Sequence, residues 1–330
     1  MNDPLIYVRA IHYAATITAV GAVFFPVFIA GPVFRRSGDG ARAPAILRVQ
    51  LAWIAWIGLA VAAVSGAAWF VLVAQSMSGS PFADLFSKGV FSIVLLQTGF
   101  GRDWLARLIL ACLLAAMLVV RFGRRSNKSA VTDALAVTFA GVLVGTLAFA
   151  GHAVGARGIE GIVHPAADFA HLVAAAAWVG TLLPLALLLA AVAHEGTSVD
   201  VAHTAIRRFS NFGLVIVGLL LLTGIINALY LAGSVSALTQ TDYGRLLLIK
   251  VALFLVMVAI AVVNRQIWTP RLVRDGSPAS GRHALGRLRR NAAMEAGLGA
   301  IIIVIVAVLG VTPPPALQPQ AMPGMQHHSH

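Results

Sequence analysis

The chain has 330 residues, of which 59% are hydrophobic and only 11% are charged, and its mean hydropathy is +0.88. Soluble globular domains carry about 25% charged residues, so this composition argues against a soluble enzyme, a nucleic-acid binder or a disordered protein. It indicates an integral membrane protein, in which the net charge of +12 reflects lysines and arginines held in cytoplasmic loops.

Eight apolar segments reach the length of about 20 residues that a helix needs to cross a bilayer. In chain order they are Leu5–Phe34, Ile46–Ala74, Trp104–Phe122, Ala130–Gly151, Pro165–Ala193, Phe209–Ala232, Gly244–Trp268 and Asn291–Val311. The segment Val90–Leu96 is apolar but too short to cross, so we expect it at the interface or as a re-entrant piece. The predicted fold class is an all-α, polytopic bundle of about eight transmembrane helices.

Positive charge alternates from loop to loop. Most of the 24 lysines and arginines lie in the loops that follow the first, third, fifth and seventh segments. Such loops are cytoplasmic by the positive-inside rule. We therefore expect a multi-pass protein of the bacterial inner membrane with both termini in the periplasm.

The chain contains signs of an internal repeat. His12 and His171 are each followed nine residues later by glycine (Gly21 and Gly180), and then by proline. The pair Ser65-Gly66 in the second segment corresponds to Thr223-Gly224 in the sixth, and Gly101-Arg102 corresponds to Gly244-Arg245. These matches predict two four-helix units of the same orientation, over residues 1–151 and 152–312, followed by a periplasmic tail over residues 313–330.

Ionisable residues gather at the outer ends of the segments. Spacings of four and three place His164, Asp168 and His171 on one helix face, with Pro165 expected in the first turn. His12 and His152 are expected at the same level. Imidazole is a good ligand for copper, zinc and nickel, so we interpret the five side chains as a metal site. The alternative is a set of interfacial polar residues that cap helices or extend toward water.

The C-terminal tail also carries candidate metal ligands. It carries Met322, Met325, His327, His328 and His330 in a proline-containing segment. Thioether sulfur favours Cu(I), and imidazole also suits Cu(II), so the tail is a candidate for capturing copper. A tail without a metal-binding role is the alternative.

Further polar residues accompany the outer cluster. The candidates for orienting ligands or balancing charge are Arg9, Trp178, Asn227 and Lys250. Lys250 or Arg9 could pair with Asp168, and Glu295 could pair with the basic run 287–290. Cys112 is the only cysteine, which leaves no intramolecular disulfide, and we expect it in the core.

An ordered set of motifs resembles the copper resistance protein D family. The motifs are Arg208-Phe209-Ser210, Thr223-Gly224, Tyr243-Gly244-Arg245, Lys250, Asn264-Arg265 with Pro270, Glu295, Leu309-Gly310 and Pro313-Pro314, clearest over residues 205–312. The fifth segment, with His164, Asp168, His171, Trp178 and Gly180, also looks like the family pattern. The resemblance implies an eight-helix inner-membrane protein of copper homeostasis. It also implies import of copper from periplasm to cytoplasm, together with a periplasmic copper-binding partner of the CopC type.

Two other functions compete with copper import. His12 and His171 occupy equivalent positions in the repeat and could be the axial ligands of haem b, which would make the chain a haem protein or an oxidoreductase. A copper sensor or docking protein without transport is the third reading. No nucleophile–base arrangement, phosphate-binding loop or pair of acid/base carboxylates points to an ordinary enzyme, so we expect none.

Overall fold

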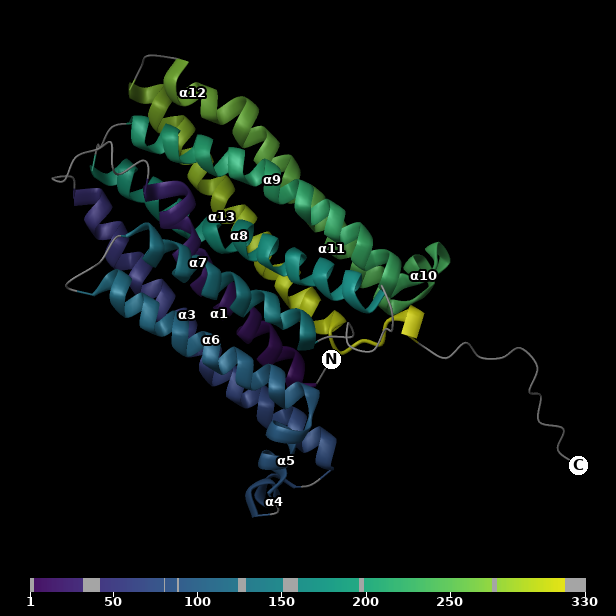
Figure 1. Cartoon of the computed structure of the whole chain (residues 1–330). Coiled ribbons are helices and arrows are strands. Elements are labelled where there is room, and N and C mark those ends of the chain that lie inside the picture. Colours follow the sequence, from purple (N-terminus) through teal and green to yellow (C-terminus); the bar gives the residue numbers. More distant parts are fainter. Residues whose placement is uncertain are drawn as a thin grey trace, which may run out of the picture.

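The computed structural model describes residues 3–31, 42–79, 81–87, 89–123, 129–150, 160–195, 199–274 and 278–317, and every regular element among them is helical (Figure 1). Eight helical stretches in these residues are long and apolar enough to cross a membrane, which confirms the predicted fold class and all eight segments. The long helices are α1 (Pro4–Phe25), α3 (Arg42–Ser78), α6 (Gly99–Phe122), α7 (Ala130–Gly145), α8 (Glu160–Glu195), α9 (Val199–Ala232), α11 (Asp242–Val263) and α13 (Pro278–Leu309).

Shorter elements extend or connect them. The π-helical η1 (Pro26–Ala30) continues α1, the 3-10 helix η2 (Thr146–Ala150) continues α7, and η3 (Asn264–Trp268) with α12 (Thr269–Arg274) continues α11. The connecting helices are α4 (Phe82–Ser87), α5 (Val90–Gln97), α10 (Val235–Gln240) and η4 (Pro315–Leu317). Helices α9 and α13 begin well before the predicted segments Phe209–Ala232 and Asn291–Val311, so His203 and His283 lie in helices.

Helices α1 and α8 form the centre of the bundle. In the most apolar stretch of α1, 72% of the residues are buried, and in that of α8 61% are buried. Only 6% are buried in the corresponding stretch that begins with α11. The two central helices touch at Gly21 and Gly180, where a Cβ atom added to Gly180 would lie 3.0 Å from the Cα atom of Gly21. Both histidines singled out in the repeat therefore lie on the two innermost helices.

Two long helices begin in the same way. Thr98 Oγ1 accepts a hydrogen bond from the backbone N–H of Gly101 at 2.9 Å and donates one to the Val94 carbonyl at 2.6 Å. Thr241 Oγ1 accepts from Gly244 at 3.0 Å and donates to the Ala237 carbonyl at 2.7 Å. A side-chain oxygen in this position satisfies an N–H group that the first turn of a helix leaves free. Helices α6 and α11 thus follow the short helices α5 and α10 through one shared geometry, which is the correspondence that a repeat requires.

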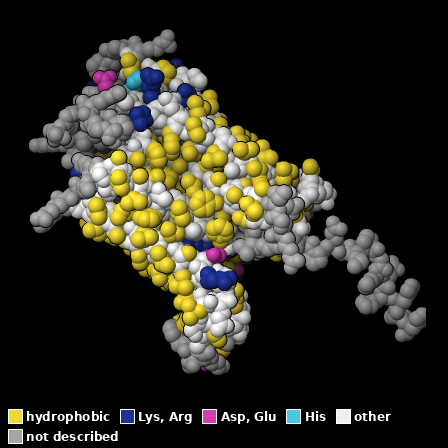
Figure 2. Space-filling model, in the orientation of Figure 1, with side chains coloured by type: hydrophobic (Ala, Val, Ile, Leu, Met, Phe, Trp, Pro, Cys, Tyr) yellow, Lys and Arg dark blue, Asp and Glu magenta, His cyan; other side chains and the backbone are white. Residues whose placement is uncertain are grey.

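The outer surface is apolar. Figure 2 shows hydrophobic side chains around the middle of the molecule, with Lys and Arg gathered toward its ends. Cys112 is exposed on this surface, so the expectation that it packs in the core is wrong. Its helix, α6, turns most of its side chains outward, since only 17% of its apolar stretch is buried. The N-terminal end of α1 lies at the same end of the bundle as α10 and η4 (Figure 1).

Candidate metal centre

His171 on α8 is oriented by a residue of α9. Its Nδ1 atom lies 2.9 Å from Thr223 Oγ1, and that hydroxyl donates its own hydrogen to the Leu219 carbonyl at 2.6 Å. Because the hydroxyl hydrogen is already used, Thr223 accepts and His171 Nδ1 donates. The Nε2 atom of His171 then carries the free lone pair, which is the arrangement that a metal-binding imidazole needs.

His12 on α1 has the same arrangement. Its Nδ1 atom lies 2.9 Å from the Ala62 carbonyl and 3.2 Å from Ser65 Oγ. Ser65 in turn donates to the Val61 carbonyl at 2.6 Å, so Nδ1 is again the donor. Gly66 faces the His12 ring as Gly224 faces the His171 ring, and a Cβ atom there would lie 3.1 Å and 3.5 Å from the respective Cε1 atoms.

The surroundings of His171 include a carboxylate. Asp168, one turn earlier on α8, accepts a hydrogen bond from Asn227 Nδ2 at 3.2 Å. Lys250 on α11 is close enough to Asp168 for their opposite charges to interact, although no ion pair joins them among the described residues. The charge of Asp168 also acts on the hydroxyl group of Tyr243. A neutral imidazole beside a carboxylate can bind a cation.

The surroundings of His12 have the opposite charge. Arg9 and Arg107 lie over the Trp69 ring at 5.0 Å and 5.6 Å, and the His12 ring meets the same indole edge-on at 5.5 Å. Arg9 donates to the Gly310 carbonyl at 2.7 Å and to the Tyr13 hydroxyl at 3.0 Å, rather than to Asp168. Two guanidinium groups disfavour a metal cation, so His171 suits copper better than His12 does.

The side chain of His164 is packed more closely than is usual for a side chain that is free to bind a metal. Its ring is stacked on Tyr230 with centroids 5.2 Å apart, and only 7% of the residue is exposed. Pro165 lies inside α8 and not in its first turn, because the helix begins five residues earlier at Glu160. The prediction that Pro165 lies in the first turn was wrong, because the helix begins with residues that precede the predicted apolar segment.

Within the described part of the chain, no group of three or more His, Cys, Asp or Glu side chains could hold a metal ion. His164, Asp168 and His171 share α8, but they and His12 are not brought into one such group. His152, Met322, Met325, His327, His328 and His330 lie outside the described residues.

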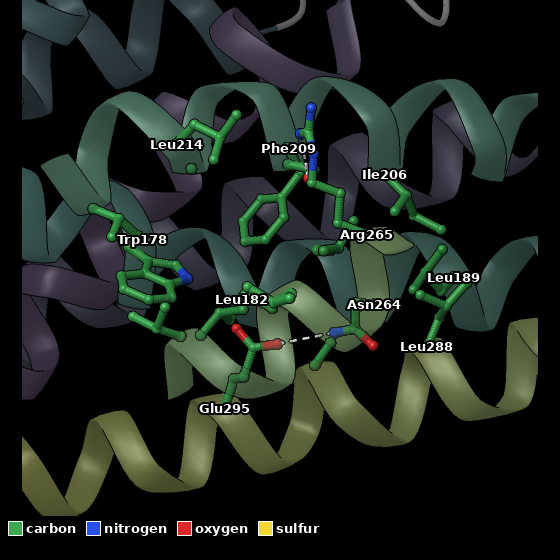
Figure 3. Close-up of a pocket in the computed structure, with 18 residues that line it drawn as sticks. Trp178, Leu182, Leu189, Ile206, Phe209, Leu214, Asn264, Arg265, Leu288 and Glu295 are labelled. Carbon is green, nitrogen blue, oxygen red and sulfur yellow. Dashed lines mark hydrogen bonds between the residues drawn. The ribbon is translucent and has the colours of Figure 1, made fainter. Parts of the chain in front are cut away.

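Trp178 lies away from the outer cluster. It lines a cavity of about 100 Å³ in the other half of the bundle, together with Glu295, Asn264 and Arg265 (Figure 3). Glu295 is 1% exposed, and its Oε1 atom accepts a hydrogen bond from Asn264 Nδ2 at 3.0 Å. The suggested pairing of Glu295 with the basic run of α13 is replaced by this amide contact.

Sequence analysis named Asn227 and Lys250 near His171, but it did not include Trp69 and Arg107, their counterparts around His12, in the candidate site. Trp69 and Asn227 each lie four residues after the hydroxyl residue that orients the histidine, and Arg107 and Lys250 each lie six residues after a matched glycine. The match of Gly101 to Gly244 in the repeat also aligns Arg107 with Lys250. The contrast in charge appears only when the neighbouring helices are in place.

Two family models cover most of the chain. The model of the copper resistance protein D-like N-terminal domain matches residues 1–162, and that of copper resistance protein D matches residues 203–309.

Three curated proteins are similar over nearly the full chain. Copper resistance protein D of Pseudomonas syringae pv. tomato is 32% identical over 95% of this chain and 98% of its own length. Inner membrane protein YebZ of Escherichia coli (strain K12) is 30% identical over 94% of the chain and 98% of its own. Copper transport protein CutJ of Bacillus subtilis (strain 168) is 28% identical over 93% of the chain and 52% of its own. No solved structure is significantly similar. With eight spans, full-length relatives and both family models in agreement, the chain belongs to the copper resistance protein D family.

Proposed function

We propose that this protein moves copper from the periplasm to the cytoplasm across the inner membrane, with His171 and Asp168 as its first binding site. The observation that carries the proposal is the orientation of His171, whose Nδ1 atom is bonded to Thr223 and whose Nε2 lone pair is free. The names of two relatives, which refer to copper resistance and copper transport, support copper as the cargo.

The proposed orientation follows from charge. The arginine-rich loops face the cytoplasm, so both termini and the His171 end of the bundle face the periplasm. A periplasmic copper-binding protein of the CopC type delivers copper there, and the tail donors Met322, Met325, His327, His328 and His330 assist capture. The bilayer is the other partner, and no nucleic acid is involved. The chain is divided into two four-helix units, 1–151 and 152–312, and the tail.

Each residue around His171 has a separate role in the proposed copper site. The imidazole supplies a nitrogen ligand, and the Asp168 carboxylate balances the charge of the cation or binds it directly. Asn227 holds that carboxylate in place. The charge of Lys250 attracts Asp168 and therefore competes with copper, which keeps affinity low enough for release. His12, His152 and His164 complete the proposed donor set, in which His12 and His164 are secondary to His171 because of the arginines near His12 and the stacking of His164 on Tyr230.

Copper binding to the detergent-purified protein tests the site. His171→Ala should lower copper affinity at least about tenfold, as loss of a metal site's supporting groups does. His203→Ala is the matched control, because His203 lies near the start of α9. That is the end of the bundle where the arginine-rich loops join the helices, called the arginine-rich end below. Equal affinity of the two variants would refute the site. Copper uptake into proteoliposomes of known orientation then tests transport and its direction.

Haem binding is the second candidate. It is favoured by one observation, namely that His12 and His171 are held in the same tautomer by equivalent partners. A Soret band that is lost in both His12→Ala and His171→Ala would establish it. A protein that binds copper without admitting it to proteoliposomes would instead be a sensor or docking protein.

A further inference from the structure

Glu295 is a buried carboxyl group that the copper site does not use. It lies on α13, is 1% exposed and points toward the cavity between α8, α9, α11 and α13 (Figure 3). Its Oε1 atom accepts from Asn264 and the Trp178 indole also acts on the carboxyl, but its Oε2 atom is buried without a hydrogen bond of good geometry among the described residues. An unpaired oxygen of an ionised carboxylate in such surroundings is strongly unfavourable. A bound proton removes that cost.

No neighbouring helix supplies a charge that would hold Glu295 ionised. Arg265, on the cavity wall, donates its Nη1 atom to Ser210 Oγ at 2.8 Å and to Asn211 Oδ1 at 2.9 Å. In the described residues no ion pair with Glu295 is formed. No charged group in the described part of the chain acts on the Glu295 carboxyl. Among its neighbours, Arg208 of α9 donates to the Phe28 carbonyl, Arg271 of α12 and Arg287 of α13 lie over Trp268, and Arg9 of α1 donates to the Gly310 carbonyl.

Two amide side chains are bonded in series to the Oε1 atom of Glu295. Asn264 Oδ1 accepts a hydrogen bond from Asn291 Nδ2 at 2.7 Å, so the two amides and the carboxyl form one chain. Asn291 also lines a second, more open hollow between α11 and α13, together with Arg287 and Arg290. The cavity at Glu295, at about 100 Å³, exceeds the roughly 10–15 Å³ that one water molecule needs on this measure. The carboxyl therefore has room for water beside it.

We propose that Glu295 is a proton-binding site on the arginine-rich side of the bundle, which holds a proton on its Oε2 atom in the state described here and exchanges it with water in the adjoining cavity. On release, the O–H bond of the carboxyl breaks and its proton passes to water, leaving the carboxylate. As a cation crosses the bundle in one direction, this proton is available to move in the other. That coupling rests on the proposed copper transport, whereas proton binding itself does not.

Infrared spectroscopy of the purified protein tests proton binding directly. At neutral pH we expect the stretching band of a protonated carboxyl group in the wild-type protein and its loss in Glu295→Gln. Asp168→Asn, which alters another carboxyl of the bundle, should keep the band. Glu295→Asp should keep a shifted band, which guards against misfolding of the glutamine variant. A band that is absent from the wild type, or unchanged in Glu295→Gln, would overturn the proposal.

Proteoliposomes that enclose a pH-sensitive dye test the coupling. Copper entry into wild-type vesicles should be accompanied by proton movement, and Glu295→Gln should move at least about tenfold fewer protons per copper while retaining wild-type copper affinity in detergent. Equal proton movement per copper in both proteins would overturn the coupling. Wild-type vesicles that admit no copper would overturn the proposed transport instead, and the infrared band would still decide whether Glu295 holds a proton.

Discussion

Gly21 and Gly180 lie against each other at the crossing of α1 and α8, with no side chain between the two backbones. A Cβ atom added to Gly21 would overlap the carbonyl group of Gly180, and one added to Gly180 would overlap the carbonyl of Ile17. Each glycine lies nine residues after the histidine of its own helix. The close approach of the two central helices therefore fixes how the two histidine-bearing segments are placed.

Gly21→Ala should destabilise the protein. The added methyl group meets backbone atoms that can move only with their helix, so we expect a loss of about 1–3 kcal/mol or more, measured as a lower midpoint of thermal unfolding in detergent. Gly218→Ala on α9 is the matched control, because a Cβ atom there meets open space and alanine favours the helix. A Gly21→Ala midpoint equal to that of the control would contradict the close crossing.

Thr223→Val should weaken copper binding without removing a ligand. Valine has nearly the shape of threonine but offers no oxygen to His171 Nδ1, so the imidazole loses the bond that orients it. We expect copper affinity to fall about 10- to 100-fold. Thr181→Val serves as the control, since Thr181 bonds only to carbonyls of its own helix. An equal effect of both substitutions would show that the hydroxyl of Thr223 has no special part in binding.

The ion pair of Arg121 and Asp133 should stabilise the arginine-rich end. It joins α6 to α7, and the Arg121 side chain is only 11% exposed. Asp133→Asn should therefore cost about 1–3 kcal/mol of unfolding free energy and leave copper affinity unchanged. The exposed pair of Arg245 and Asp242, at 3.7 Å, provides the comparison, and Asp242→Asn should cost little. Similar losses in both variants would contradict the difference in burial.

Labelling of single cysteines should establish the orientation. In a Cys112→Ser background, Ser236→Cys on α10 should react in intact cells with a thiol reagent that cannot cross the inner membrane. Arg282→Cys on α13, at the other end of the bundle, should react only after the cells are opened. The reverse pattern would place the termini in the cytoplasm and would reverse the proposed direction of copper entry.

The sequence was a good guide to the spans and a weaker one to the site. Apolar length and loop charge predict all eight helices, because the bilayer imposes the same requirement on each. The repeat paired Ser65 with Thr223 but assigned them no role, because their function as hydrogen-bond acceptors depends on contacts between helices. Glu295 was expected near arginine because the two are close along the chain. The helix instead turns it toward Asn264 of another segment.

The matched hydrogen bonds of His12 and His171 give the chain an internal reference. Both imidazoles have the same orientation and the same tautomer, while the residue three positions earlier is Arg9 in one case and Asp168 in the other. Exchanging those two residues would change the sign of the local charge and leave the imidazole geometry as it is. The settings of His12 and His171 can therefore be compared within one protein. Such a comparison separates the effect of charge on metal choice from the effect of shape.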